Sequence, residues 1–136
     1  MTISKYISDF LSTYDGIKVE TNHVQDGSDK YGLFKSPGRT VVEFNDCAYR
    51  ITENYQFFAK QNSNSEYDRQ DSDAWLEDIT YWVDDYPWLN DYPDIDGNRK
   101  VEMIQLTGNP YPMEADGKET LYQMSLSITY IRERMD

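Results

Sequence analysis

Cysteine, basic residues and long apolar runs are all scarce in this sequence. It contains one cysteine, Cys47, among 136 residues, so no disulfide can form within the chain, which excludes the disulfide-stabilised secreted proteins. No apolar run approaches the roughly 18 residues of a membrane-spanning helix, and the opening MTISKYISDF lacks the basic start and apolar core of a signal peptide. We therefore expect a protein that is made in the cytoplasm and does not enter a membrane.

The shortage of basic residues excludes a further class of protein. The chain has 13 Lys and Arg residues against 25 Asp and Glu residues, which gives a formal net charge of -12. Proteins bind nucleic acids largely by placing Lys and Arg against phosphates, so tight DNA or RNA binding is not expected. The chain does not have a disordered composition either, because 15% of its residues are aromatic and its apolar residues recur with regular periods.

Two segments have the apolar spacing of helices. The first ends before Gly16, a typical helix C-cap, and its apolar stripe consists of Ile3, Tyr6, Ile7, Phe10, Leu11 and Tyr14. The second follows a polar loop with candidate caps at Asp71 and Ser72, and Pro87 is predicted to end it. Its apolar face consists of Trp75, Leu76, Ile79, Trp82, Val83 and Tyr86.

The other apolar residues follow the strand period of two. The predicted strands are residues 17–21, a hairpin over residues 39–60 with its turn at Asn45 and Asp46, the segment VEMIQLTG, and a closing strand over ETLYQMSLSITYIRERM. The prolines of NPYPMEADGKE suit a bulge or an edge strand. This order of elements predicts an α+β fold, a mostly antiparallel sheet flanked by two helices, as a single domain over residues 1–136.

Few residues could carry chemistry. His23 is the only histidine, and no Ser or Cys motif near it supplies a nucleophile. The segment DYPDIDGN superficially resembles a calcium-binding loop, but counting from Asp94 puts Arg99 where the sharp-turn glycine belongs and Gln105 where the bidentate glutamate belongs. No glycine-rich phosphate loop and no CxxC motif is present. We therefore expect no catalytic residue, no metal and no cofactor, and a protein that acts by contact.

One region carries a resemblance to a known family. ENYQFFAKQNSNSEYDRQDSDAWLEDITYWVDD and GNRKVEMIQLTGNPYPMEADGKETLYQMSLSITYIR form a long strand, a polar loop with R-x-x-x-D, an amphipathic helix, a strand with a glycine-containing break and a long alternating strand. In this succession the chain from Tyr49 to Arg132 resembles the small neck proteins of long-tailed bacteriophages and prophages, known as tail terminator or minor capsid proteins. The helical segment before it is compatible with this family but less distinctive.

The resemblance implies an architecture and a role. Proteins of this kind have an antiparallel sheet flanked by helices and assemble as a hexameric ring on the end of the tail tube. The ring stops tube growth and joins the tail to the filled head. The expected partners are therefore copies of the same chain, the tail tube protein and the head-tail connector proteins, with DNA passing through the lumen without tight binding. The expected location is the virion neck, after assembly in the host cytoplasm.

Acidic and basic residues are separated along the chain in a way that suits a ring. Subunits of a closed ring meet through two different, complementary surfaces. We hypothesise that an early basic group meets a later acidic group across the subunit boundary, and that exposed aromatic residues add contact area. The residues of this interface are Lys30, Lys35, Arg39, Asp84, Asp85, Trp88, Asp91, Tyr92, Asp94 and Asp96.

Two other interpretations stay open at this point. A head completion or connector protein also forms a ring at the neck, but it binds on the portal side. An acidic inhibitor that mimics DNA would occupy the basic groove of a nucleic-acid enzyme, and it would need carboxylates spaced regularly along one surface. Here the carboxylates cluster in loops and around one helix, which counts against the inhibitor.

Overall fold

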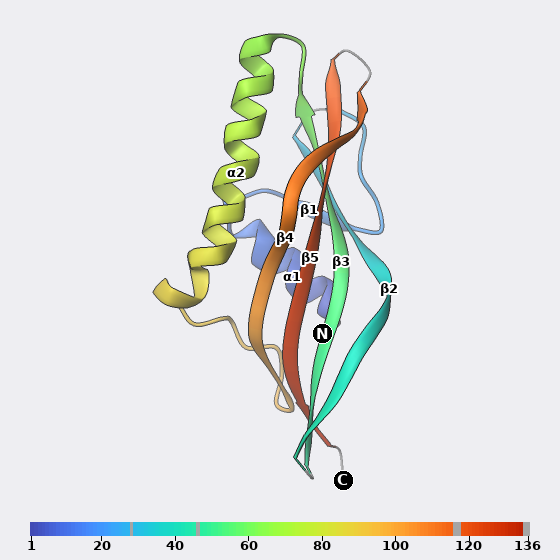
Figure 1. The fold of residues 1–136 in the computed structure, drawn as a ribbon, viewed down its shortest axis with the longest axis vertical. Coiled ribbons are helices and arrows are strands. Elements are labelled where there is room, and N and C mark those ends of the chain that lie inside the picture. Colours follow the sequence, from blue (N-terminus) through green and yellow to red (C-terminus); the bar gives the residue numbers. More distant parts are fainter. Residues whose placement is uncertain (28, 46, 116–117, 135–136) are drawn as a thin grey trace.

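The structure is a computed structural model that describes residues 1–27, 29–45, 47–115 and 118–134. Its elements are α1 (Ile3–Ser12), β1 (Val19–Thr21), β2 (Lys30–Asn45), β3 (Ala48–Asn62), α2 (Glu66–Leu89), β4 (Arg99–Ala115) and β5 (Glu119–Glu133). The strands form one five-stranded sheet in the order β1-β2-β3-β5-β4. All neighbouring strands are antiparallel except β1 and β2, so the predicted α+β class is confirmed (Figure 1).

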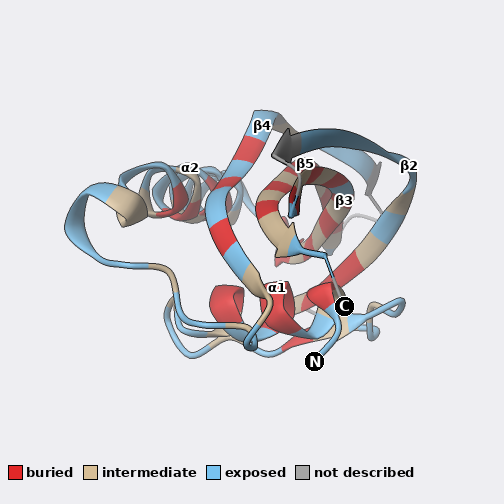
Figure 2. Cartoon of the chain, turned by 90° about the horizontal axis from the view of Figure 1, so that it is seen from below, coloured by how far each residue is buried: buried red, intermediate tan, exposed pale blue. Residues whose placement is uncertain are grey.

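The central pair of strands, β3 and β5, sets the two faces of the sheet. They pair without a register shift from Ala48 opposite Glu133 to Asn62 opposite Glu119. Along both strands buried and less buried residues alternate, because successive side chains point to opposite faces (Figure 2). The buried face contributes to the core Ile51, Tyr55, Phe57, Ala59, Tyr122, Met124, Leu126, Ile128 and Tyr130.

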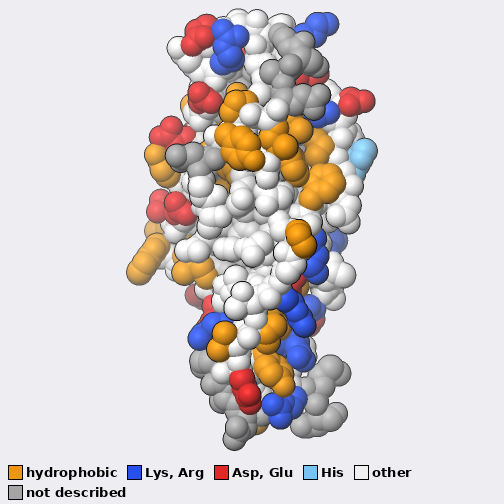
Figure 3. All heavy atoms as spheres, turned by 45° about the vertical axis from the view of Figure 1, so that its right-hand side comes forward, with side chains coloured by type: hydrophobic (Ala, Val, Ile, Leu, Met, Phe, Trp, Pro, Cys, Tyr) orange, Lys and Arg blue, Asp and Glu red, His pale blue; other side chains and the backbone are white. Residues whose placement is uncertain are grey.

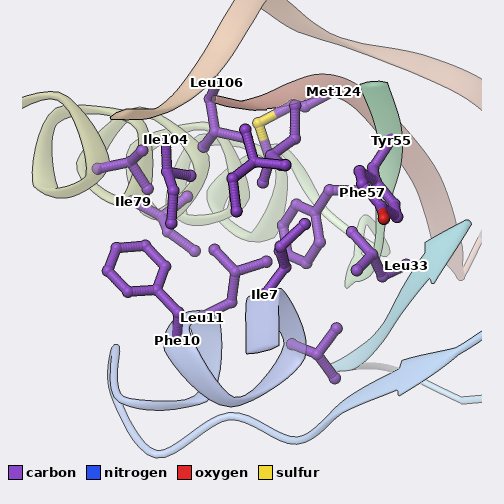
Figure 4. Close-up of a cluster of buried hydrophobic side chains, with 14 of the residues drawn as sticks. Ile7, Phe10, Leu11, Leu33, Tyr55, Phe57, Ile79, Ile104, Leu106 and Met124 are labelled. Carbon is purple, nitrogen blue, oxygen red and sulfur yellow. The ribbon is translucent and has the colours of Figure 1, made fainter. Parts of the chain in front are cut away.

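Both helices cover this buried face. Helix α2 contacts β3 and β4, and α1 lies against β1 and β2, so the two helices cover different parts of the same face. Ile7, Phe10 and Leu11 of α1 point toward Ile79 of α2 and toward the strand residues between the two helices (Figure 4). The aromatic rings of Phe10 and Trp82 lie 5.0 Å apart, which joins the two helices directly.

The opposite face of the sheet carries no helix, and uncharged polar side chains line its middle. The hydroxyls of Thr52 on β3 and Thr129 on β5 are 3.0 Å apart. Gln56 donates to the Ser36 hydroxyl at 3.0 Å and accepts from Ser125 at 3.4 Å, so the hydrogen bonds cross from β2 to β5. These side chains therefore satisfy one another while staying in reach of water.

The two edges of the sheet differ. On the β2 side, β1 pairs only with Tyr31 to Leu33, and beyond Leu33 the outer edge of β2 has no strand partner among the described residues. On the β4 side, the Tyr92 hydroxyl accepts a hydrogen bond from the Ile104 backbone N–H at 3.1 Å, and register shifts flank the prolines, as predicted for an edge. The β2 edge is therefore open and the β4 edge is partly capped.

Helix α2 begins earlier than predicted. Ser65 is the N-cap and accepts from the Asp68 backbone N–H at 3.1 Å, so the helix starts at Glu66 and not after Ser72. The Ser72 side chain instead donates to the Asn62 carbonyl at 2.9 Å. The polar stretch looked like a loop because its first two turns face solvent, where apolar periodicity is absent.

The prediction that Pro87 ends α2 is wrong. The helix continues through Pro87 to Leu89, with Asn90 as its C-cap. Proline lacks the N–H that would bond to the Val83 carbonyl, but the Asn90 backbone N–H still reaches the Tyr86 carbonyl at 2.8 Å. The helix tolerates this one missing hydrogen bond because it lies near the end, so α2 continues for two residues beyond Pro87.

The strand boundaries also depart from the prediction. Strand β2 starts at Lys30, nine residues before the predicted Arg39, because it pairs with β3 on both sides of a register shift between Lys35 and Arg39. Gly38 has φ +84 inside this irregular stretch, a conformation that favours glycine. The irregular stretch interrupts the alternation of apolar residues, so the first half of β2 was not predicted as a strand. Of the predicted turn residues, Asp46 lies outside the described residues.

Burial of α2 can be tested with two leucines on the same helix. Leu76 is 1% exposed, so Leu76→Ala is expected to lower the free energy of unfolding by about 2–5 kcal/mol through lost contacts and a cavity. Leu89 is 77% exposed, so Leu89→Ala should change it by less than about 0.5 kcal/mol. Urea denaturation followed by circular dichroism measures both, and equal losses would contradict this packing of α2.

Candidate functional site

The most unusual side chain of the core is a carboxylate, Glu53 of β3. It follows Ile51 by two residues and precedes Tyr55 by two, so it shares their inward-facing phase and is only 4% exposed. A buried carboxylate is costly unless hydrogen bonds or an opposite charge compensate it.

Three side chains supply that compensation. The Tyr130 hydroxyl of β5 donates to Glu53 Oε2, and the Tyr55 hydroxyl donates to Oε1 at 3.2 Å. Lys35 Nζ of β2 lies 3.3 Å from the same Oε1. Both carboxylate oxygens are therefore occupied by donors from three strands, and Lys35 keeps its own charge partly in water because its side chain is 61% exposed.

A pocket of about 540 Å³ opens above this cluster, beside the start of α1. Its lining includes Thr2, the N-cap of α1, together with Asn22 and Arg99. Arg99 binds Asp96, with 3.2 Å between Arg99 Nε and Asp96 Oδ1, and also donates to the Met1 carbonyl. The charged groups Glu53, Lys35 and Arg99 in the pocket wall are therefore already engaged within the chain.

The pKa values in the cluster move away from neutrality. Burial raises the pKa of the Glu53 carboxyl, but the hydrogen bond from Tyr130, the charge of Lys35 and the hydrogen bond from Tyr55 outweigh burial and lower it below 4.5. Burial, together with the neighbouring carboxylate, raises the pKa of Tyr55 to about 12. Burial and the hydrogen bond to Glu53 also raise the pKa of Tyr130. At neutral pH the glutamate is ionised and both tyrosines are protonated.

This arrangement favours a structural role over catalysis. A general acid or base works best with a pKa near the working pH, and none of the three groups has one. Both oxygens of the carboxylate also already accept contacts from the chain's own side chains. We interpret the cluster as a polar connection that ties β2, β3 and β5 together beneath the start of α1.

The predicted acidic interface residues lie at one end of α2 and in the connection to β4. Asp84, Asp85, Asp91 and Asp94 are exposed. Asp96 is also exposed, but its carboxylate is held by Arg99, which lowers its pKa. The structure thus brings the first pair together with Trp88 on the last turns of the helix and leaves Asp96 engaged within the chain.

The predicted basic and aromatic residues are distributed differently. Lys35 is engaged with Glu53, whereas Arg39 is exposed and forms no ion pair with the part of the chain that the structure describes. Lys30 is half-buried at the start of β2. Trp88 is 87% exposed, but Tyr92 is half-buried and stacks 5.5 Å from Tyr86, so little of its ring is available to a partner.

Charge is segregated on the surface. Helix α2 carries eight carboxylates and a single basic residue, Arg69. Lys and Arg gather at the lower right of the view in Figure 3, whereas Asp and Glu lie mostly at its left margin and uncharged side chains fill the centre. The two margins of the sheet therefore differ in the sign of their charge.

The described residues offer no evident place for an ion. Across residues 1–27, 29–45, 47–115 and 118–134, no three His, Cys, Asp or Glu side chains are grouped so that they could hold a metal. Neither described helix combines the length and apolar character needed to cross a membrane.

Comparison with protein-family models gives no match, and comparison with curated proteins gives no significant similarity.

Sequence reasoning missed Glu53, the residue around which the buried cluster is built. The signal was its phase: in the alternation of β3 it occupies an inward position between Ile51 and Tyr55. A charged residue in such a position marks a buried polar contact, although its partners on β2 and β5 come from pairings that local periodicity does not reveal.

The Glu53 cluster predicts a pH-dependent stability. Because folding lowers the pKa of Glu53, its ionised form stabilises the fold above the ordinary value of 4.5, and this contribution is lost as the pH falls below that value. Glu53→Gln should lower the free energy of unfolding by about 1–3 kcal/mol at pH 7. The difference from the unmodified protein should shrink as the pH is lowered toward about 3.

The matched control is Glu133→Gln, which removes an exposed carboxylate from the end of β5. It should leave stability nearly unchanged at both pH values. Urea denaturation of the three proteins at several pH values is the measurement. A constant difference between the Glu53 variant and the unmodified protein at all pH values would contradict the ionised, hydrogen-bonded state.

Proposed function

We propose that the protein is a structural subunit of the head-tail neck of a long-tailed phage, where a ring of its copies caps the tail tube, ends tail growth and joins the tail to the head. The proposal starts from the resemblance of residues 49–132 to tail terminator proteins. The observation that carries it is the helix-free face of the sheet, whose centre is uncharged. Hydroxyl and amide side chains line part of it, and a group of apolar side chains lies beside them (Figure 3).

This face suits the wall of a channel through which DNA must move. Lys or Arg side chains would hold the phosphates by releasing counterions, and a strongly acidic wall would oppose entry of the polyanion. The middle of the face instead presents hydroxyl and amide groups, including Thr52, Gln56, Ser125 and Thr129, which bond mainly to one another. Such a wall neither binds DNA tightly nor excludes it.

The charges that border this face also suit a channel. At one end Arg50 Nε lies 2.8 Å from Glu102 Oε1, so a basic residue next to the polar centre is neutralised within the chain. Helix α2, which carries eight of the 25 acidic residues, packs on the other face. With the sheet toward the lumen and α2 toward the outside, the acidic helix would stay clear of the DNA path.

A head-side connector fits the same surface, so the experiment must separate the two roles. Deleting the gene from the phage or prophage that carries it, inducing particles and measuring tail lengths in negative-stain micrographs does so. We expect overlong tails beside unjoined, filled heads, because nothing would stop tube growth. Restoring the gene in trans should return both tail length and infectivity.

Two other outcomes would contradict this role. Tails of normal length beside tailless heads would place the protein on the head side of the neck. Normal infectious particles would remove it from the neck altogether and favour the DNA-mimic interpretation, in which α2 presents its carboxylates to a basic groove.

A further inference from the structure

An exposed apolar patch lies where α2 ends beside β4. Its members, which we call the α2-end patch, are Trp88, 87% exposed, Leu89, 77% exposed, and Met103, 39% exposed, with Asp84 and Asp85 one turn earlier on the helix. A hollow of about 440 Å³ runs along the edge of β4 and is lined by Asp84, Trp88 and Met103. A large aromatic side chain that is almost fully exposed to water marks a surface that contacts a partner more often than a surface that binds nothing.

The charges of this patch gain nothing from the chain itself. Asp84 and Asp85 sit near the C-terminus of α2, where the helix dipole disfavours carboxylates, and the last turn contains no basic residue. Neither forms an ion pair with the described residues. Two uncompensated carboxylates beside an exposed Trp need a basic and apolar partner.

A surface of that kind lies on the opposite margin of the sheet. Its members, which we call the β2-edge patch, are Arg39 and Val41, 46% exposed, whose side chains share one face of β2, and Val42, 52% exposed, which points to the other face along the same edge. Arg39 forms no ion pair with the described chain, and the strand edge here is open because β1 ends its pairing at Leu33. Arg39 is the register partner of Glu53, whose carboxylate already binds Lys35, and it remains exposed. Together with the neighbouring valines it complements the α2-end patch in charge and in apolar character.

The geometry points to a head-to-tail contact in which the α2-end patch of one copy docks on the β2-edge patch of a second copy. Because the two patches lie at opposite margins of one sheet, the contact is heterologous and leaves the docked pair with one free patch of each kind, one on each copy. Repetition of the contact therefore adds copies in one direction and closes only as a ring. The inference rests on the ring-forming part of the proposed function and specifies which surfaces make it.

The competing contact is a two-fold pairing of β2 edges. In an antiparallel pair centred on Val41, Arg39 of one copy would face Glu43 of the other, and assembly would stop at a dimer. Glu43 is already 3.7 Å from Arg134 in its own chain, which reduces the gain from such a pair. The two contacts predict different crosslinked products.

Crosslinking can decide between them. In a Cys47→Ser background, Val41→Cys and Leu89→Cys are introduced together, and the purified protein at high concentration is treated with a short bismaleimide. We expect a ladder of dimer, trimer and higher species that ends at the ring order. Each single-cysteine chain alone should stay uncrosslinked, and an equal mixture of the two should give dimer only.

Other products would overturn the contact. Dimer from the Val41→Cys chain alone would establish two-fold pairing of β2 edges. No ladder from the double-cysteine chain under conditions where a flexible crosslinker reacts fully with both thiols would show that the two patches do not meet.

A charge swap tests the chemistry of the contact. The chain with Asp84→Lys/Asp85→Lys and Leu89→Cys, mixed with an unswapped Val41→Cys chain, should give at least about tenfold less crosslinked dimer. Mixing it instead with a chain carrying Arg39→Glu and Val41→Cys should restore the dimer, because the signs are again opposite. Glu77→Lys/Asp78→Lys, an adjacent pair of exposed acids on the same helix, is the control with equal charge change.

The outcome is separable from that of the gene deletion. A ladder together with normal tails in the deletion would keep the head-to-tail contact and remove the neck role. Overlong tails in the deletion without a ladder would keep the neck role and assign ring contacts to other surfaces.

Discussion

The rest of the structure depends on the unbroken pairing of β3 with β5. Fifteen residues of each strand pair in one register, which fixes a single buried face and a single open face over the full length of the sheet. Both helices dock on the buried face, and the polar network with its Thr, Ser and Gln side chains forms on the other. A slip of one residue would exchange the two faces, so the alternation in these strands carries most of the information about the fold.

The same pairing places a charge in the core without exposing it. Glu53 lies on the buried face where β2, β3 and β5 run side by side, so Lys35 and Tyr130 reach it from either side. The start of α1 lies beside this group, and Tyr6 of α1 donates to the carbonyl of Pro93, in the connection between α2 and β4, at 2.6 Å. The N-terminal helix is thus positioned by directional polar contacts as well as by its apolar stripe.

Local periodicity was sufficient for the elements whose faces differ in polarity. The apolar stripe of α1 and the alternation from Tyr122 to Tyr130 predicted both the elements and the residues they bury. Periodicity failed where a segment faces solvent all round, as at the start of α2, or where Gly38 and Pro37 interrupt β2. The interface residues were predicted as types, but the engagement of Lys35 with Glu53 and of Asp96 with Arg99 depends on neighbours in space. Glu53 was missed for the same reason.

The unequal edges of the sheet have a consequence for the fate of newly made chains. An exposed strand edge can recruit the edge of another molecule, and a sheet with two open edges can extend without limit into fibres. Here Tyr92 occupies an outward-facing amide of β4, and two prolines remove further donors from that strand. Strand addition is therefore hindered at the β4 edge, so chains at a high local concentration on a polysome cannot extend the sheet from copy to copy into fibrils.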